Sequence, residues 1–137
     1  MQEHLQDYLT QTISIYDTDK ESFYHGLILG LYAIMNNLYI VKSNRESGNG
    51  RYDIQMEPID KNSPGIIVEI KVLNKQIKEN ESLIKDELEQ LSIEAINQID
   101  NKHYEKEMIN NGIKDILKLG IAFYKKETHI SFKENLY

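Results

Sequence analysis

The chain has 137 residues, of which 28% are charged and 40% hydrophobic, and its formal net charge is −6. This length gives room for a single domain with one core, spanning residues 1–137, and the composition is typical of a globular protein. The absence of cysteine excludes disulfides, thiolate metal sites and a cysteine nucleophile. Without a long apolar run or a signal-peptide pattern, the sequence predicts a cytoplasmic protein with no membrane partner.

The N-terminal part predicts helix. Residues 2–10 favour a short helix, residues 12–15 an extended piece, and residues 19–37 a helix that is apolar nearly all round, Ile34 included, and therefore buried. Glu21 and His25 share one face of that helix because they are four residues apart. Glu21 also fits a capping box, so it is either that capping acid or part of a site. His25 either packs within the helix or contacts a substrate.

Three strands follow, over about 38–42, 51–56 and 65–72, with polar turns at 43–51 and 58–64. The third strand is the most informative, because Glu69 and Lys71 point the same way from an otherwise apolar run. Burying either charge costs several kcal/mol unless it is compensated. The alternative is a half-solvated strand whose outer face carries two charges.

The second and third strands are expected to pair antiparallel. If Asp53 lies opposite Glu69, their Cβ atoms are about 5 Å apart and one cation can bridge the carboxylates. A register slip of one residue would place them on opposite faces. The sequence alone leaves both registers open.

The C-terminal half predicts a helix over about 80–110, with either a break near 90–93 or a frayed start, and a stop at Asn111-Gly112. Glu94, Gln98 and Lys102 form a polar stripe beside its apolar one. Strands are predicted over 116–124 and 128–132.

The collinear set Asp53…Glu69-Ile70-Lys71, after a helix with Glu21 and before one with Gln98, resembles the PD-(D/E)XK nuclease superfamily. The segments ESFYHG, SNRESGNGRYD, EIK, AINQI and KLGIAF resemble one group within it, over roughly residues 12–132. That group is commonly attached to the C-terminal side of an AAA-ATPase-like domain. Tyr52 stands where the family has its proline, a departure that leaves the ligand set intact.

The resemblance implies an α/β fold, a three-layer α/β/α sandwich with a central mixed β-sheet and a restriction-endonuclease-like core. It implies a nuclease that hydrolyses phosphodiester bonds with Mg²⁺ or Mn²⁺, and Asp53 and Glu69 as the metal ligands. Hard oxygen ligands are those that these cations prefer. Lys71 would hold or polarise the attacking water, Gln98 would contact the site, and Glu21 would approach the metal.

Substrate contacts are expected from five residues: His25, Arg45, Arg51, Lys102 and Tyr104. The two arginines otherwise only support the glycine-rich turn. The expected partners are nucleic acid, with DNA favoured over RNA, and an AAA-ATPase-like domain in cis or in trans, while a homodimer stays open.

Two function classes follow. One is a Mg²⁺-dependent phosphodiesterase, that is, a nuclease. The other is a catalytically silent PD-(D/E)XK-fold module that binds nucleic acid or a partner protein. The intact Asp53, Glu69 and Lys71 favour the enzyme, whereas the charge of −6 favours the silent module because nucleic-acid binding normally relies on Lys and Arg.

Overall fold

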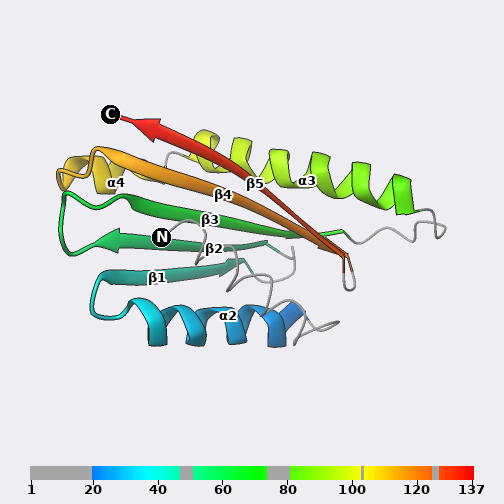
Figure 1. Ribbon diagram of the computed structural model, residues 1–137, viewed down its shortest axis with the longest axis horizontal. Helices are drawn as coiled ribbons and strands as arrows, with labels where there is room; N and C mark the ends of the chain where they lie inside the picture. Colours follow the sequence, from blue (N-terminus) through cyan, green and yellow to red (C-terminus); the bar gives the residue numbers. More distant parts are fainter. Residues whose placement is uncertain (1–19, 47–50, 74–80, 103, 125–126) are drawn as a thin grey trace.

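The computed structural model describes residues 20–46, 51–73, 81–102, 104–124 and 127–137, with side chains except at 20–25, 27–28, 44–46, 51–52 and 81. They form an α/β fold around a five-stranded mixed sheet in the order β1-β2-β3-β4-β5 (Figure 1). The strands are β1 (Tyr39–Glu46), β2 (Arg51–Pro58), β3 (Gly65–Val72), β4 (Asp115–Tyr124) and β5 (Glu127–Leu136). The described helices are α2 (Lys20–Met35), α3 (Glu81–Lys102) and α4 (Glu105–Asn110).

The connections follow from the directions of the strands. Neighbouring strands pair antiparallel except β3 and β4, which run parallel. A parallel pair needs a long crossover, and α3 and α4 lie in the segment that joins β3 to β4. The helical part ends before Gly112, whose φ of 93° favours glycine, so the predicted stop is confirmed. Within the described residues, no helix has both the length and the apolar character required to cross a lipid bilayer.

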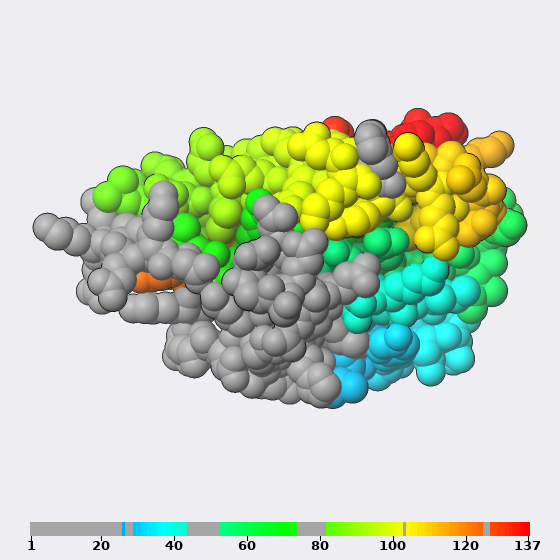
Figure 2. Space-filling view, turned by 180° about the vertical axis from the view of Figure 1, so that it is seen from behind, coloured from blue at the N-terminus to red at the C-terminus, as the bar shows by residue number. Residues whose placement is uncertain are grey.

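The sheet buries apolar side chains on both faces. The alternation in β3 predicted this only for the face of Ile66, Val68 and Ile70, and the half-solvated alternative for the other face was wrong, since Glu69 is 1% exposed. One buried cluster combines α2 with alternating residues of β3: Leu31, Met35, Ile66, Val68 and Ile70. A second cluster combines β3 with α3 and α4: Ile67, Ile99 and Met108. Helices α3 and α4 therefore cover the face that also carries Glu69 and Lys71. Figure 2 shows them as a yellow-green to golden band on one side of the molecule, with α2 and β1, in blue to cyan, on the other.

Two helix predictions were wrong in detail. Helix α2 is not buried all round, since Ile34 is 54% exposed while Leu31 is 1% exposed. The reason is that α2 packs through the stripe of Leu31 and Met35. Helix α3 runs unbroken through 90–93 and ends at Lys102, so the break falls before α4. Ser92 does not interrupt it because its hydroxyl donates a hydrogen bond back to the Glu89 carbonyl, 2.8 Å away.

The strands are longer than predicted at two places. β1 continues to Glu46, into the predicted turn, because its residues keep pairing with β2 as far as Arg51. β5 continues to Leu136 because it pairs along the whole length of β4, down to Asp115. Predictions for residues 2–10 and 12–15 lie outside the described residues.

Candidate active site

Asp53 and Glu69 lie directly opposite each other in the antiparallel β2–β3 pair, so the structure has the first of the two registers that the sequence left open. They are 7% and 1% exposed, and they share the face of the sheet that α3 and α4 cover. A directly opposed pair places two Cβ atoms about 5 Å apart. Two buried carboxylates at this separation repel each other unless positive charge stands nearby, which makes the pair a candidate cation site.

Tyr104, the residue immediately before α4, reaches this pair. Its hydroxyl donates a hydrogen bond to Oδ2 of Asp53 at 3.3 Å. Burial raises the pKa of Tyr104, a hydrogen bond with Lys102 lowers it, the negative charges of Asp53 and Glu69 raise it, and the net shift is upward. The Nζ atom of Lys102 lies 5.6 Å from the centre of the Tyr104 ring. The phenol predicted to bind substrate therefore contacts Asp53, and the predicted amine lies beside that phenol.

Lys71 and Gln98 lie on two different elements, β3 and α3, and α3 packs on the face of the sheet that carries Lys71. Lys71 is half-buried, and it follows Glu69 by two residues on the same face of β3. Gln98 lies one helical turn before Lys102 on α3, on the same side of the helix. The Oε1 atom of Gln98 is buried and accepts no hydrogen bond from the described residues. Such an atom costs free energy when it is buried alone, so a ligand or water that binds it is favoured.

Gly120 lets α3 approach the sheet beside this pair. It lies opposite Glu69 across the parallel β3–β4 pair. A Cβ atom at Gly120 would stand 2.0 Å from the carbonyl oxygen of Ser92 and 2.9 Å from Cγ1 of Ile96. Real Cβ atoms do not come so close to a backbone carbonyl, so glycine is required for the observed position of α3. Ser92 is further anchored by the hydroxyl of Ser131 on β5, 2.6 Å from its own.

Sequence reasoning missed a buried ionic group next to this site. Lys118 of β4 is 1% exposed, and its Nζ donates hydrogen bonds to Asp100 at 2.5 Å and to the Tyr137 hydroxyl at 3.3 Å. An Oε1 atom of Glu105 lies 3.9 Å from the same Nζ, and Lys133 binds Asp100 at 2.7 Å. The available signal was a single lysine inside an otherwise apolar strand.

Burial alone would lower the pKa of Lys118. The hydrogen bonds to Asp100 and Tyr137 and the charges of Glu105 and Asp100 outweigh burial, and the pKa is raised. Lys118 is therefore a buried cation held by two carboxylates from two different helices.

Four predicted site residues cannot be placed by their side chains. Glu21 and His25 belong to α2, Arg45 to β1 and Arg51 to β2, but their side chains lie outside the described part of the structure. The other six are described: Asp53, Glu69 and Lys71 share one face of the sheet, Tyr104 contacts Asp53, and Lys102 lies beside Tyr104. Gln98 lies on α3, the helix that covers this face, one turn before Lys102.

The donor set fits a hard divalent cation. Mg²⁺ is usually held by one or two carboxylates, while water and substrate phosphate fill its remaining positions, and Asp53 and Glu69 supply two opposed carboxylates. Among the described residues, no group of three or more acidic or histidine side chains converges.

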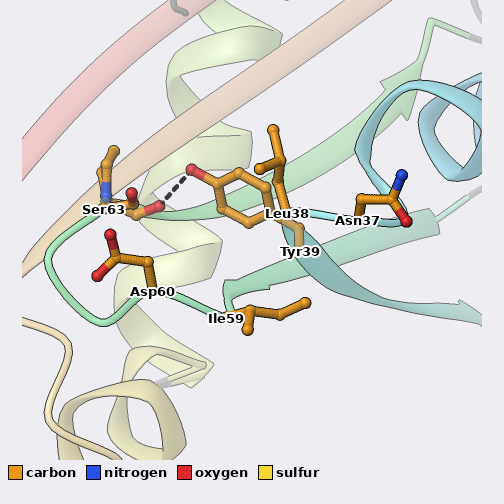
Figure 3. A pocket seen from close by; sticks show the side chains of 7 residues that line it. Asn37, Leu38, Tyr39, Ile59, Asp60 and Ser63 are labelled. Carbon is orange, nitrogen blue, oxygen red and sulfur yellow. Dashed lines mark hydrogen bonds between the residues drawn. The ribbon is translucent and has the colours of Figure 1, made fainter.

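A surface pocket of about 420 Å³ lies elsewhere. It is lined by residues at the start of β1 and in the β2–β3 turn: Asn37, Leu38, Tyr39, Ile59, Asp60, Ser63 and Pro64 (Figure 3). Pro64 immediately precedes β3, and Glu69 is five residues further along, roughly 16 Å in an extended strand. The pocket is therefore separate from the carboxylate pair.

A family model for the PD-(D/E)XK nuclease superfamily matches residues 19–133. No curated protein and no solved structure matches the chain. The family match spans most of the sequence and includes Asp53, Glu69 and Lys71, as the resemblance of the motifs predicted. The protein therefore belongs to the PD-(D/E)XK nuclease superfamily.

Proposed function

We propose that this protein is a metal-dependent nuclease whose cation is held by Asp53 and Glu69. Members of the superfamily generally are nucleases that use divalent metals such as Mg²⁺ or Mn²⁺. The single observation that carries the proposal is the direct pairing of two buried carboxylates on one face of the sheet. A cation bound by this pair would offset the free energy that burying both charges costs.

The carboxylates would act as oriented ligands. Tyr104 binds one oxygen of Asp53, which fixes the plane of that carboxylate. The backbone of β3 fixes the position of Glu69. On the neighbouring strand, Gly120 has no side chain, so the backbone of α3 packs beside Glu69. Precise placement matters because phosphoryl transfer relies mainly on positioning and on electrostatic stabilisation.

Lys71 and Gln98 would serve the attacking water. When bound, a divalent cation supplies positive charge to the phosphate oxygens and makes water a better nucleophile. Lys71 stands on the same face as Glu69 and carries a second positive charge. Gln98 presents a buried amide oxygen with no partner among the described residues, which would accept a hydrogen bond from water. The proposed role of Glu21, approach to the same cation, comes from the family resemblance.

We further propose DNA as the preferred substrate over RNA. Lys102 lies beside Tyr104 and would meet a phosphate, and Arg45, Arg51 and His25 would extend that contact. An AAA-ATPase-like domain, in cis or in trans, would supply the affinity for nucleic acid that a chain of net charge −6 lacks.

We also propose one domain built as a three-layer α/β/α sandwich. Leu31 and Met35 of α2 support the second helical layer, because they pack on the sheet face opposite α3.

The test is cleavage of supercoiled DNA, single-stranded DNA and RNA with Mg²⁺ or Mn²⁺. Wild type should cleave DNA, and Asp53→Asn and Glu69→Gln should each lose at least about 100-fold in rate because a ligand charge is removed. Glu89→Gln is the matched control, since Glu89 is an exposed carboxylate on the opposite side of α3 from Gln98, and it should keep the wild-type rate. If wild type cleaves none of these nucleic acids, the silent binding module becomes the better interpretation.

A further inference from the structure

Tyr104 contacts the carboxylate pair from the helical side, at the point where α3 and α4 meet. Lys102 is the last residue of α3, and Tyr104 immediately precedes Glu105, the first residue of α4. Tyr104 binds Asp53, and Lys102 lies against Tyr104. The position of this junction over the sheet therefore decides where the phenol meets the carboxylate.

Lys118 holds both sides of that junction at once. Its Nζ binds Asp100, two residues before the end of α3, and lies 3.9 Å from Glu105 at the start of α4. The lysine itself stands on β4 opposite Ile67, two residues from Gly120 and on the same face as Glu69. The single buried amine of Lys118 thus connects β4 to both α3 and α4, the two helices on either side of Tyr104.

A purely structural explanation accounts poorly for a charge at this position. Ile67 and Ile116, nearby on β3 and β4, are fully buried in an apolar cluster, so an apolar side chain at 118 would have apolar neighbours. Replacing a buried ion pair by apolar residues is often neutral or stabilising. What an apolar side chain cannot do is bind two carboxylates from different helices in a fixed direction.

We propose that Lys118 is a positioning residue, which sets the α3–α4 junction so that Tyr104 meets Asp53. The proposal rests on the proposed function, because it assigns the buried ionic group to the same site. Lys133 provides the contrast. It binds the other oxygen of Asp100, but it is 47% exposed, and within the described part of the chain its only ion pair is with Asp100.

The first test needs no metal and no substrate. The unfolding equilibrium constants of wild type, Lys118→Met, Tyr104→Phe and the double variant form a double-mutant cycle. If Lys118 positions Tyr104, the two substitutions should depart from additivity by about fivefold or more, although Lys118 contacts Asp100, Glu105 and Tyr137 and acts on Tyr104 only through the helices. The same cycle with Lys133→Met should be additive within about twofold. Additivity in both cycles would overturn the proposal.

A second variant guards against loss of folding in Lys118→Met. Glu105→Gln keeps the volume of the side chain and removes only the charge that faces Lys118. The double-mutant cycle of Glu105→Gln with Tyr104→Phe should depart from additivity in the same direction as the cycle of Lys118→Met with Tyr104→Phe.

The second test is the affinity for Mn²⁺, measured by isothermal titration calorimetry. Lys118→Met and Tyr104→Phe should each raise the Kd about tenfold, and the double variant should rise no further, because both act through the orientation of Asp53. Lys133→Met should keep the wild-type Kd. Wild type without Mn²⁺ affinity would count against the proposed function, whereas the metal-free cycle decides the role of Lys118 separately. Independent, multiplying losses of affinity would overturn the positioning role.

Discussion

Glu69 faces Gly120 across the parallel β3–β4 pair, at the place where the backbone of α3 rests on the sheet. Glu69 and Gly120 therefore lie together at the contact between the sheet and α3. Because no Cβ fills the space beside Glu69, Ser92 and Ile96 approach the strand closely. Helix α3, which contributes Gln98 and Lys102, therefore packs closely against the sheet.

Gly120→Ala should destabilise the fold by about 2–3 kcal/mol, because the new methyl group meets a backbone carbonyl that cannot rotate away. Gly65→Ala is the matched control. Its methyl group would meet Sδ of Met108 at 2.6 Å, the end of a flexible side chain, and should cost less. Urea denaturation of both variants measures the difference. Equal losses would contradict the close approach of α3 at Gly120.

Mn²⁺ should bind wild type with a single class of site, and the binding should be largely lost in Asp53→Asn. The reason is that the substitution removes one of two ligand charges while it keeps the shape of the side chain. Calorimetric titration measures the Kd for Mn²⁺. Glu57→Gln is the control, because Glu57 lies on the same strand but outside the pair, and it should bind Mn²⁺ as wild type does. Retention of the full affinity in Asp53→Asn would exclude Asp53 as a ligand.

Tyr39 should make stability fall with rising pH above pH 10. Its hydroxyl donates to the Pro64 carbonyl at 2.8 Å (Figure 3). Burial, followed by the charge of Asp115, raises its pKa from 10.0 to about 12. Because the folded pKa lies above the unfolded one, the stabilising contribution is complete below pH 10 and is lost as pH rises towards 12.

The measurement is urea denaturation at a series of pH values from 9 to 11. The slope of stability against pH should be shallower in Tyr39→Phe than in wild type. Asp115→Asn should give an intermediate slope, since it removes the smaller of the two causes. Parallel curves for wild type and Tyr39→Phe would show that the phenol does not ionise differently on folding.

The sheet and the carboxylate pair could be predicted because they depend on local, periodic information. The alternation of β3 places Glu69 and Lys71 on one face, and turn chemistry at 58–64 makes β2 its antiparallel partner. The register, which the sequence left open, is the one in which apolar residues such as Ile54 and Val68 share the opposite face.

The buried ionic group could not be predicted because it depends on contacts between residues that are far apart in the sequence. Asp100, Glu105 and Lys118 lie on three elements, and nothing in their spacing indicates that they meet. The exposure of Ile34 was missed for a related reason. Helix α2 is apolar nearly all round, and only its packing decides which stripe is covered.

Binding to duplex DNA should be weak and strongly dependent on salt. The net charge of −6 opposes a sequence-independent grip. With only a few phosphate contacts, affinity should fall about ten- to a hundredfold between 50 and 200 mM salt. Lys102→Gln should reduce the slope of log affinity against log salt by about one. Lys61→Gln, in the β2–β3 turn, is the control and should leave the slope unchanged. Tight binding that ignores salt would contradict this prediction.

Lys71 should separate cation binding from catalysis. It stands two residues after Glu69 on the same face, but an amine is not a ligand for Mg²⁺. Lys71→Ala should therefore lose at least about 100-fold in the rate of Mg²⁺-dependent cleavage, while Mn²⁺ binds with its wild-type Kd.

Thermal unfolding and a second substitution complete this test. Lys71→Met keeps the apolar stem of the side chain, so any packing role of that stem is retained. If the amine serves the attacking water, Lys71→Met should be as inactive as Lys71→Ala and as stable as wild type or more so, since removing a half-buried charge is often neutral or stabilising. If Lys71→Met cleaves at the wild-type rate, the amine has no part in the reaction and Lys71 contributes only its stem.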